Sequence, residues 1–180
     1  MRKQILFLFG ILCSIPSLVS CQSLHEKMAI YSIQPDSAVY CNLGKTVSDV
    51  LFSPKKVTCY TIKGKATVEK GDCELEPHYV RDSLIAKLND EEIGILQFTL
   101  LADEENYGQD SVKVRAPYVP CIELCFEKKK QVAHVIVSLS NFSWTIMYDD
   151  KKLGNWNYSN KRLMERYCKM LLGDALDKIR

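Results

Sequence analysis

The hydrophobic pattern is clearest in the C-terminal half of the chain. Residues 121–127 alternate between apolar and polar side chains, residues 132–139 are almost continuously apolar, and residues 143–148 form a third apolar segment. Alternation is typical of a half-buried strand, and a short continuous apolar run is typical of a central one. Because only short polar turns separate these segments, we expect consecutive antiparallel strands. A further β-rich segment lies at residues 57–62.

Residues 77–88 show a different period. Pro77 is acceptable in the first turn of a helix, and the apolar side chains that follow recur at positions i, i+4, i+5 and i+8. This spacing predicts an amphipathic helix that ends at Asn89. Its buried stripe would consist of Val80, Leu84, Ile85 and Leu88.

Three other segments complete the expected elements. Residues 46–52 predict a short helix, and residues 93–101 predict an apolar strand. Residues 161–172 predict a final helix, capped by Asn160 and ended by Gly173. The strands group as hairpins instead of alternating with helices. This order predicts a single α+β domain, an antiparallel β-meander packed against two or three helices.

The N-terminus has the pattern of an export signal. Arg2 and Lys3 precede an apolar run over residues 5–19. About twenty apolar residues are needed to span a bilayer as a helix, so this run is too short. Its length and its charged start are typical of a secretory signal peptide.

The end of that signal resembles the lipobox of bacterial lipoproteins. An aliphatic residue and two small positions, Leu18 to Ser20, precede Cys21. The resemblance implies that the Cys21 thiol carries diacylglycerol, that the new amino terminus is acylated with a fatty acid such as palmitate, and that cleavage removes residues 1–20. Gln22, in place of aspartate, is similar to an outer-membrane sorting signal. We therefore expect a lipidated tether over residues 21–40 and a globular domain over residues 41–180.

The net charge limits the classes of partner that the chain is expected to bind. The 180-residue chain has 24 Lys and Arg against 22 Asp and Glu, a formal net charge of +2. Cleavage before Cys21 removes Arg2 and Lys3 and no acid, so the mature chain is expected to be neutral. A neutral domain is not expected to bind nucleic acid, nor to hold an anionic membrane by charge. The lipid would supply the membrane contact.

The chain has eight cysteines, of which Cys13 leaves with the signal and Cys21 carries lipid. An even number remains, which in an exported protein permits up to three disulfides. Cys59 and Cys73 flank an expected hairpin and form the best candidate pair. The other disulfide candidates are Cys41, Cys121, Cys125 and Cys168. Cys121 and Cys125 are expected on one face of a strand, too far apart to bridge each other, and either is free to meet Cys41 or Cys168.

Catalytic, cofactor and metal motifs are weak. The three histidines, His25, His78 and His134, lack metal-ligand spacing, so no metal site and no cofactor are predicted. His134 next to Cys121 or Cys125 on a neighbouring strand would form a Cys–His nucleophile pair, against the alternative of a packed histidine beside structural cysteines. No complete set of nucleophile, base and orienting group is evident, which predicts a protein that is not an enzyme.

Aromatic residues gather near the C-terminal strands. Trp144 and Tyr148 share one face of a strand, and Trp156 and Tyr158 share a face of the next segment. Rows of aromatic side chains with polar neighbours are typical of sugar-binding platforms and also of a core that packs a helix on a sheet. The four residues are therefore a candidate binding face, with core packing as the alternative.

Much of the mature sequence, including CFEKKKQVAHVIVSLS, resembles a group of small, uncharacterised envelope lipoproteins of Gram-negative gut-type bacteria. The resemblance implies a location and no activity. We therefore expect a lipid-anchored protein of the outer membrane, facing the periplasm or the cell surface. Its expected role is that of a protein-interaction module for another envelope protein, with immunity against a secreted toxin as one form. Surface glycan binding through the aromatic face is the alternative.

Overall fold

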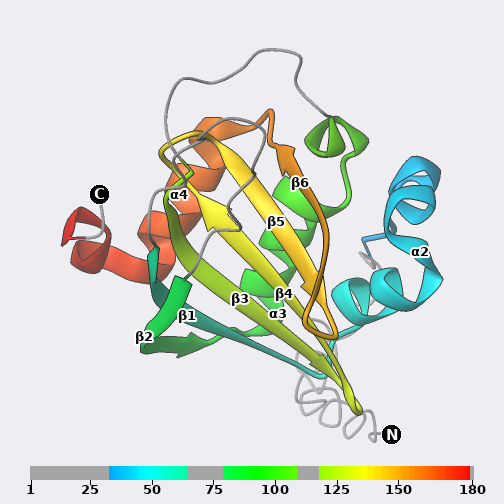
Figure 1. Cartoon of the computed structure of the whole chain (residues 1–180), viewed down its shortest axis with the longest axis horizontal. Coiled ribbons are helices and arrows are strands. Elements are labelled where there is room, and N and C mark those ends of the chain that lie inside the picture. The colour runs from blue at the N-terminus through cyan, green and yellow to red at the C-terminus, as the bar shows by residue number, and fades with distance from the viewer. Residues whose placement is uncertain (1–32, 65–78, 109–117, 179–180) are drawn as a thin grey trace, which may run out of the picture. The chain divides into compact units, whose positions relative to one another are not determined.

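The computed structural model describes residues 33–64, 79–108 and 118–178 (Figure 1). Within these residues six antiparallel strands form one sheet in the order β2-β1-β3-β4-β5-β6. The last four are consecutive along the chain and form the predicted meander. The strands are β1 Lys56–Gly64, β2 Tyr79–Lys87, β3 Pro120–Lys128, β4 Gln131–Ser138, β5 Ser143–Tyr148 and β6 Lys151–Asn157.

Helices cover one face of the sheet, and α3 and α4 lie behind it in Figure 1. Apolar side chains from that face and from the helices form one core, which includes the fully buried Phe126 and Trp144. The α+β prediction is thus confirmed. The helical elements are α2 Ser37–Phe52, α3 Asp90–Leu96, a π-helix at Gln97–Leu101, α4 Lys161–Leu172, and 3-10 turns at Glu104–Tyr107 and Gly173–Lys178.

The amphipathic helix predicted over residues 77–88 is wrong, because residues 79–87 form strand β2. Val80 and Leu84, expected in the core, are 70% and 64% exposed. Pairing with β1 includes two register shifts, and such bulges break the strict alternation that would have marked a strand. The spacing of the apolar residues alone therefore indicates a helix where the structure has a strand.

The segment after β2 also differs from the prediction. Asn89, expected to end a helix, begins α3: its side chain accepts a hydrogen bond from the Glu92 backbone at 2.9 Å, and the Glu92 carboxylate accepts one from the Asn89 backbone at 2.8 Å. This capping box satisfies two otherwise unpaired amides. Residues 93–101, predicted as a strand, complete α3 and continue as the π-helix. The burial of Leu96, Leu100 and Leu101 accounts for much of their apolar character, although Phe98 in the same segment is 69% exposed.

The two remaining helices agree better with the sequence. The short helix predicted at residues 46–52 is the end of α2, which breaks at Gly44 with a φ of +75°. Because α2 begins at Ser37 and Val39 lies in the core, residues 37–40 belong to the folded domain, although they fall in the range predicted as the tether. Helix α4 confirms the helix predicted over residues 161–172, with Gly173 at its C-terminus. Asn160 stands at the N-cap position, but its side chain makes no capping hydrogen bond. No helix among the described residues is long and apolar enough to cross a bilayer.

Substitutions at two leucines distinguish the observed fold from the predicted one. Leu96 is fully buried at the end of α3, whereas Leu84 is largely exposed on β2. We expect Leu96→Ala to lower the free energy of unfolding by about 2–5 kcal/mol. Leu84→Ala should change it by no more than about 0.5 kcal/mol. Urea unfolding of the two variants checks this, and an equal loss in both would contradict the strand assignment of β2.

Candidate functional site

A buried carboxylate lies in the middle of the sheet. Glu123 is on β3, between β1 and β4, and only 1% of the residue is exposed. Its strand neighbours Ile122 and Leu124 point into the core under the helices. Alternation therefore places Glu123 on the opposite face. Because an unpaired buried carboxylate is strongly unfavourable, the position requires partners.

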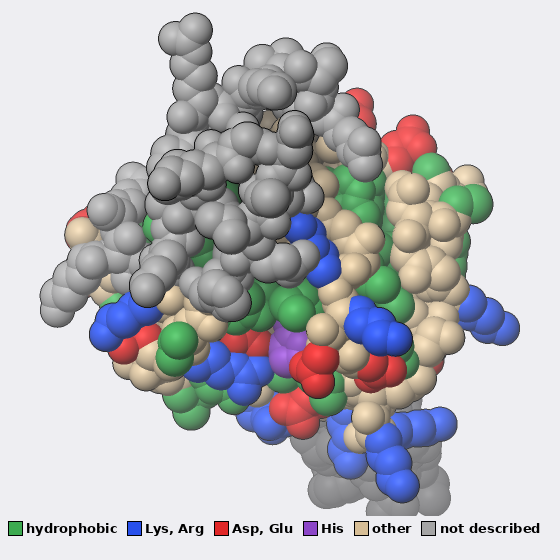
Figure 2. Space-filling view, in the orientation of Figure 1, with side chains coloured by type: hydrophobic (Ala, Val, Ile, Leu, Met, Phe, Trp, Pro, Cys, Tyr) green, Lys and Arg blue, Asp and Glu red, His purple; other side chains and the backbone are tan. Residues whose placement is uncertain are grey.

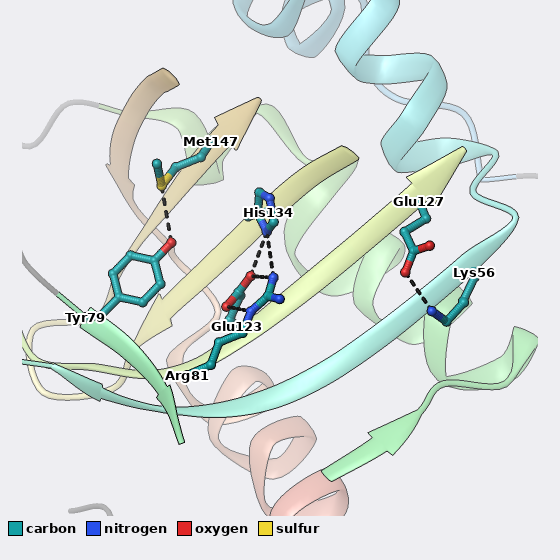
Figure 3. A network of polar contacts seen from close by, with 7 residues as sticks. All are labelled: Lys56, Tyr79, Arg81, Glu123, Glu127, His134 and Met147. Atoms are coloured by element: carbon teal, nitrogen blue, oxygen red, sulfur yellow. Dashed lines mark hydrogen bonds and ion pairs between the residues drawn. The ribbon is translucent and has the colours of Figure 1, made fainter. Parts of the chain in front are cut away.

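Arg81 and His134 supply those partners from two other strands (Figure 3). The Arg81 guanidinium donates two hydrogen bonds to Glu123, from Nε to Oε2 at 2.7 Å and from Nη2 to Oε1 at 2.6 Å. The His134 Nδ1 lies 2.6 Å from Oε1 of the same carboxylate. The fork of Arg81 is the geometry that gives strong, directional pairing with a carboxylate. The residues thus join β2, β3 and β4 through one group.

Cys125 completes what we call the Glu123 cluster, consisting of Arg81, Glu123, Cys125 and His134. Cys125 lies directly opposite His134 in the β3–β4 register. One ligand-type atom from each of Glu123, Cys125 and His134 falls within 4.8 Å of the others. Cys125 is 6% exposed, whereas the side chains of His134 and Arg81 are 16% and 45% exposed. In the space-filling view the histidine reaches the surface among acidic and basic side chains (Figure 2).

The pairing changes how the groups of the cluster titrate. Burial opposes ionisation of Glu123, but the hydrogen bonds from Arg81 and from His134 outweigh it and lower its pKa to about 2. Contacts with the Cys125 thiol and the Glu123 carboxylate raise the pKa of His134 to about 9, against the opposing effect of burial. Near neutral pH the cluster therefore contains an ionised carboxylate between two cations.

Further polar side chains surround the cluster on the same face. The Arg81 guanidinium lies 4.5 Å from the centre of the Tyr60 ring, within range of a cation–π contact. The Tyr79 hydroxyl donates to the Met147 sulfur at 3.3 Å, and burial raises its pKa to about 12. Tyr118 and Thr145 share a hydrogen bond of 3.0 Å between their hydroxyls. The face opposite the helices thus carries directed polar contacts beside buried apolar side chains such as Ile136.

Sequence reasoning found part of this cluster. The pairing of His134 with a cysteine was one of its alternatives, and the structure brings His134 together with Cys125 and not with Cys121. Glu123 and Arg81 were missed. Nothing local in an alternating strand indicates that its polar position is buried, and Arg81 had been assigned to a helix.

The expectation that Cys121 and Cys125 share a face is wrong. The β3–β4 register shifts between Pro120 and Ile122, so Cys121 is an inserted residue. Its thiol donates to the Val137 carbonyl at 3.2 Å and hydrogen bonds with the Cys168 thiol of α4, inside the core. The bulge therefore separates a core cysteine from the cysteine of the Glu123 cluster.

No disulfide forms among the five cysteines of the described residues. Cys41 is exposed on α2, and Cys59 is buried on β1. Cys73, the predicted partner of Cys59, lies outside the described residues, as does Cys21, the predicted lipidation site. Of the pairs considered, the structure brings together Cys121 and Cys168.

The candidate aromatic binding face does not form. Trp144 is fully buried and Tyr158 is 2% exposed. The Trp144 indole donates to the Asn106 carbonyl at 2.8 Å and packs on Trp156, with ring centres 5.5 Å apart. Tyr148 and Trp156 are partly buried against the same core. Trp144 and Tyr158 fill the space between sheet and helices, so these two rings are not available to stack on a sugar.

Comparisons with protein-family models, with curated proteins and with solved structures found no match to this chain. The chemistry open to the Glu123 cluster therefore follows from its own geometry. A carboxylate, an imidazole and a thiol in one place are able to pair charges, to share a proton or to ligate a soft metal ion. Arg81 adds a fixed positive charge that also ties the outermost strand to the sheet.

The shifted titrations predict how stability depends on pH. The pKa of Glu123 falls from its usual 4.5, so its contribution is present above pH 4.5 and is lost as the pH drops toward 2. The pKa of His134 rises from 6.5, so its contribution is complete below pH 6.5 and is lost as the pH rises through 9. We expect the free energy of unfolding of the metal-free wild-type chain to fall by on the order of 2–3 kcal/mol between pH 6.5 and 9.

Urea unfolding at a series of pH values measures this loss. His134→Gln removes the titrating group and should flatten the curve between pH 6.5 and 9. A variant that keeps the wild-type slope would show that another group is responsible.

Proposed function

We propose that this chain is a lipid-anchored cell-envelope protein whose folded domain is a protein-interaction module, and that the partner binds along strand β2. The observation that carries the proposal is the exposure of Val80 and Leu84, at 70% and 64%, on a strand at the end of the sheet. Exposed apolar side chains on an edge strand are a known liability for aggregation. Retaining two of them on one strand is best explained if they are covered by a partner.

Two of the three charged residues of β2 are paired with neighbouring strands, whereas the third, Lys87, is exposed at the end of the strand. Arg81 reaches inward to Glu123, and Asp82 pairs with Lys63 of β1 at 2.6 Å. A charge that is committed to a neighbouring strand does less to repel an incoming one. Val80 and Leu84 are the largely exposed apolar side chains of the strand.

The backbone of β2 supports the same mode of binding. Within the described part of the chain, β2 pairs with β1 and with no strand on its other side. An extended segment of a partner would add to that edge through main-chain hydrogen bonds, with Val80 and Leu84 giving selectivity. The opposite edge, β6, begins with two exposed lysines, Lys151 and Lys152, and Asn157 bridges to Gly108, whereas the one lysine of β2, Lys87, is its last residue. Lysines at an edge discourage strand addition.

The anchor supports the location of the partner. A lipid on Cys21 would hold the domain at the outer membrane, where it meets proteins of the envelope and proteins delivered by neighbouring cells. Immunity against a secreted toxin is one form of such a role. A deletion strain should then be more sensitive to competing bacteria, and unchanged survival in co-culture would count against immunity while leaving the interaction module in place.

The edge strand is tested by substitution. The tagged full-length chain, gently solubilised from native envelopes, should retain one stoichiometric partner. The double variant Val80→Lys, Leu84→Lys should lose it, because lysines on the edge oppose strand pairing and remove the apolar contact. Leu153→Lys, which changes an exposed leucine on β6, is the matched control and should keep the partner.

Because all three positions are exposed, the urea midpoints of these variants should match the wild type. Equal recovery of the partner by the double variant and by the wild type would overturn the role of β2. Absence of any stoichiometric partner in the wild-type lane would overturn the interaction module itself.

The anchor has its own test. Cys21→Ala removes the thiol that receives the lipid, so we expect an uncleaved precursor that incorporates no radiolabelled palmitate. Cys41→Ser removes an exposed cysteine of the folded domain and should be labelled normally. Labelling of the Cys21→Ala chain would refute lipidation at that residue.

A further inference from the structure

The Glu123 cluster contains three side chains that are typical ligands of a borderline-soft metal ion. We propose that Glu123, Cys125 and His134 form a binding site for a divalent zinc-class cation, with a fourth coordination position left to water or to a ligand. The inference does not rest on the proposed interaction module. It concerns the opposite face of the sheet from the helices and a different chemistry.

The types of ligand atom in the cluster determine which metal ion it is expected to bind. Thiolate, imidazole and a single carboxylate suit Zn²⁺, whereas Ca²⁺ and Mg²⁺ require several oxygen ligands. Ligand-type atoms of the three residues already lie within 4.8 Å of one another. Ligand atoms of a tetrahedral zinc site lie roughly 3.3–3.8 Å apart, given metal–ligand distances of about 2.0–2.3 Å. The cluster therefore needs small side-chain adjustments and no change of backbone.

The strands hold these residues rigidly. Glu123 and Cys125 are two apart on β3, and His134 lies opposite Cys125 on β4. Both strands are internal to the sheet, with hydrogen-bonded neighbours on each side. Sites built on such elements keep their geometry better than sites on loops. The three ligands thus come from one hairpin, although no pair of histidines is involved.

The position now bridging His134 Nδ1 and Glu123 Oε1, which are 2.6 Å apart, is where the ion would enter. Zn²⁺ would replace the proton shared by these atoms and the proton of the Cys125 thiol. Bonds from zinc to nitrogen, oxygen and sulfur form, the N–H and S–H bonds break, and two protons leave to solvent. No oxidant or reductant is involved.

Arg81 has two roles around this site. Its Nε donates to Oε2 at 2.7 Å, a contact that can persist and fix the orientation of the carboxylate while Oε1 binds the metal. Hydrogen-bonded partners of this kind commonly orient metal ligands. Its Nη2, 2.6 Å from Oε1, must withdraw. The 45% exposure of the side chain gives it room to turn toward water.

The burial of these residues distinguishes between two functions for the site, metal binding and catalysis by a nucleophilic thiol. Cys125 is 6% exposed and Glu123 is 1% exposed. A substrate would have to bring its reacting atom against the sulfur, whereas a single ion needs only the space between three side chains. The geometry thus favours metal binding over nucleophilic attack.

Cobalt spectroscopy tests the site. The full-length chain, purified in detergent, reduced and freed of metal by chelation, is titrated with Co²⁺. We expect a near-ultraviolet thiolate-to-cobalt charge-transfer band and visible bands typical of tetrahedral coordination, both displaced by Zn²⁺. Cys125→Ser should abolish the charge-transfer band, and His134→Gln should weaken binding at least tenfold.

Cys41→Ser is the control, because Cys41 is exposed and outside the cluster; it should keep both bands. Circular dichroism confirms that each variant is folded. Should a ligand variant fail to fold, the wild-type chain still decides the matter through its own titration. Absence of a charge-transfer band in the wild type, or its persistence in folded Cys125→Ser, would overturn the proposal.

Discussion

The pairing of Glu123 with Arg81 is the interaction on which this sheet depends. A carboxylate that is almost fully buried on the central strand β3 must have partners. Arg81 provides both of its forked hydrogen bonds from the outermost strand, and His134 provides a third contact from the other side. Removing one partner of a buried ion pair costs far more than the pair contributes, since the remaining charge is left unsatisfied. The main effect of the contact is thus that β2 must occupy one position in the sheet, the one that brings Arg81 to Glu123.

The two faces of the sheet are stabilised by different physics. On the helix side, apolar side chains such as Leu124 and Trp144 pack into a core whose contacts are non-directional. The other side also carries hydrogen bonds and ion pairs with defined geometry, from the Glu123 cluster to the contact between Tyr118 and Thr145, beside buried apolar residues such as Ile136. A core tolerates exchange among hydrophobic residues of similar volume, but a polar network loses its function when a single partner is replaced. Specific chemistry is therefore to be sought on the second face.

The sequence predicted the parts of the fold that depend on strong local signals. Alternation in β3 and the apolar stripe of α4 come from burial on one side, which a regular period records directly. The errors fall where tertiary pairing decides. Leu84 lies at helical spacing from Val80, yet both belong to a bulged strand that β1 holds in place. The apolar run at residues 93–101 is compatible with a strand and with a helix. The capping box at Asn89 is the local feature that distinguishes the two structures.

The inserted residue at Cys121 has a consequence for how this chain can vary. Side chains before Cys121 alternate out of phase with those after it. Both Cys121 and Ile122 therefore contribute to the core, while Glu123 stays on the opposite face. Deleting one residue there would reverse the orientation of one of the two segments. Changes of side chain at this point are thus compatible with the architecture, but changes of length are not. In evolution, the spacing between Tyr118 and Glu123 should be more constrained than the residues that fill it.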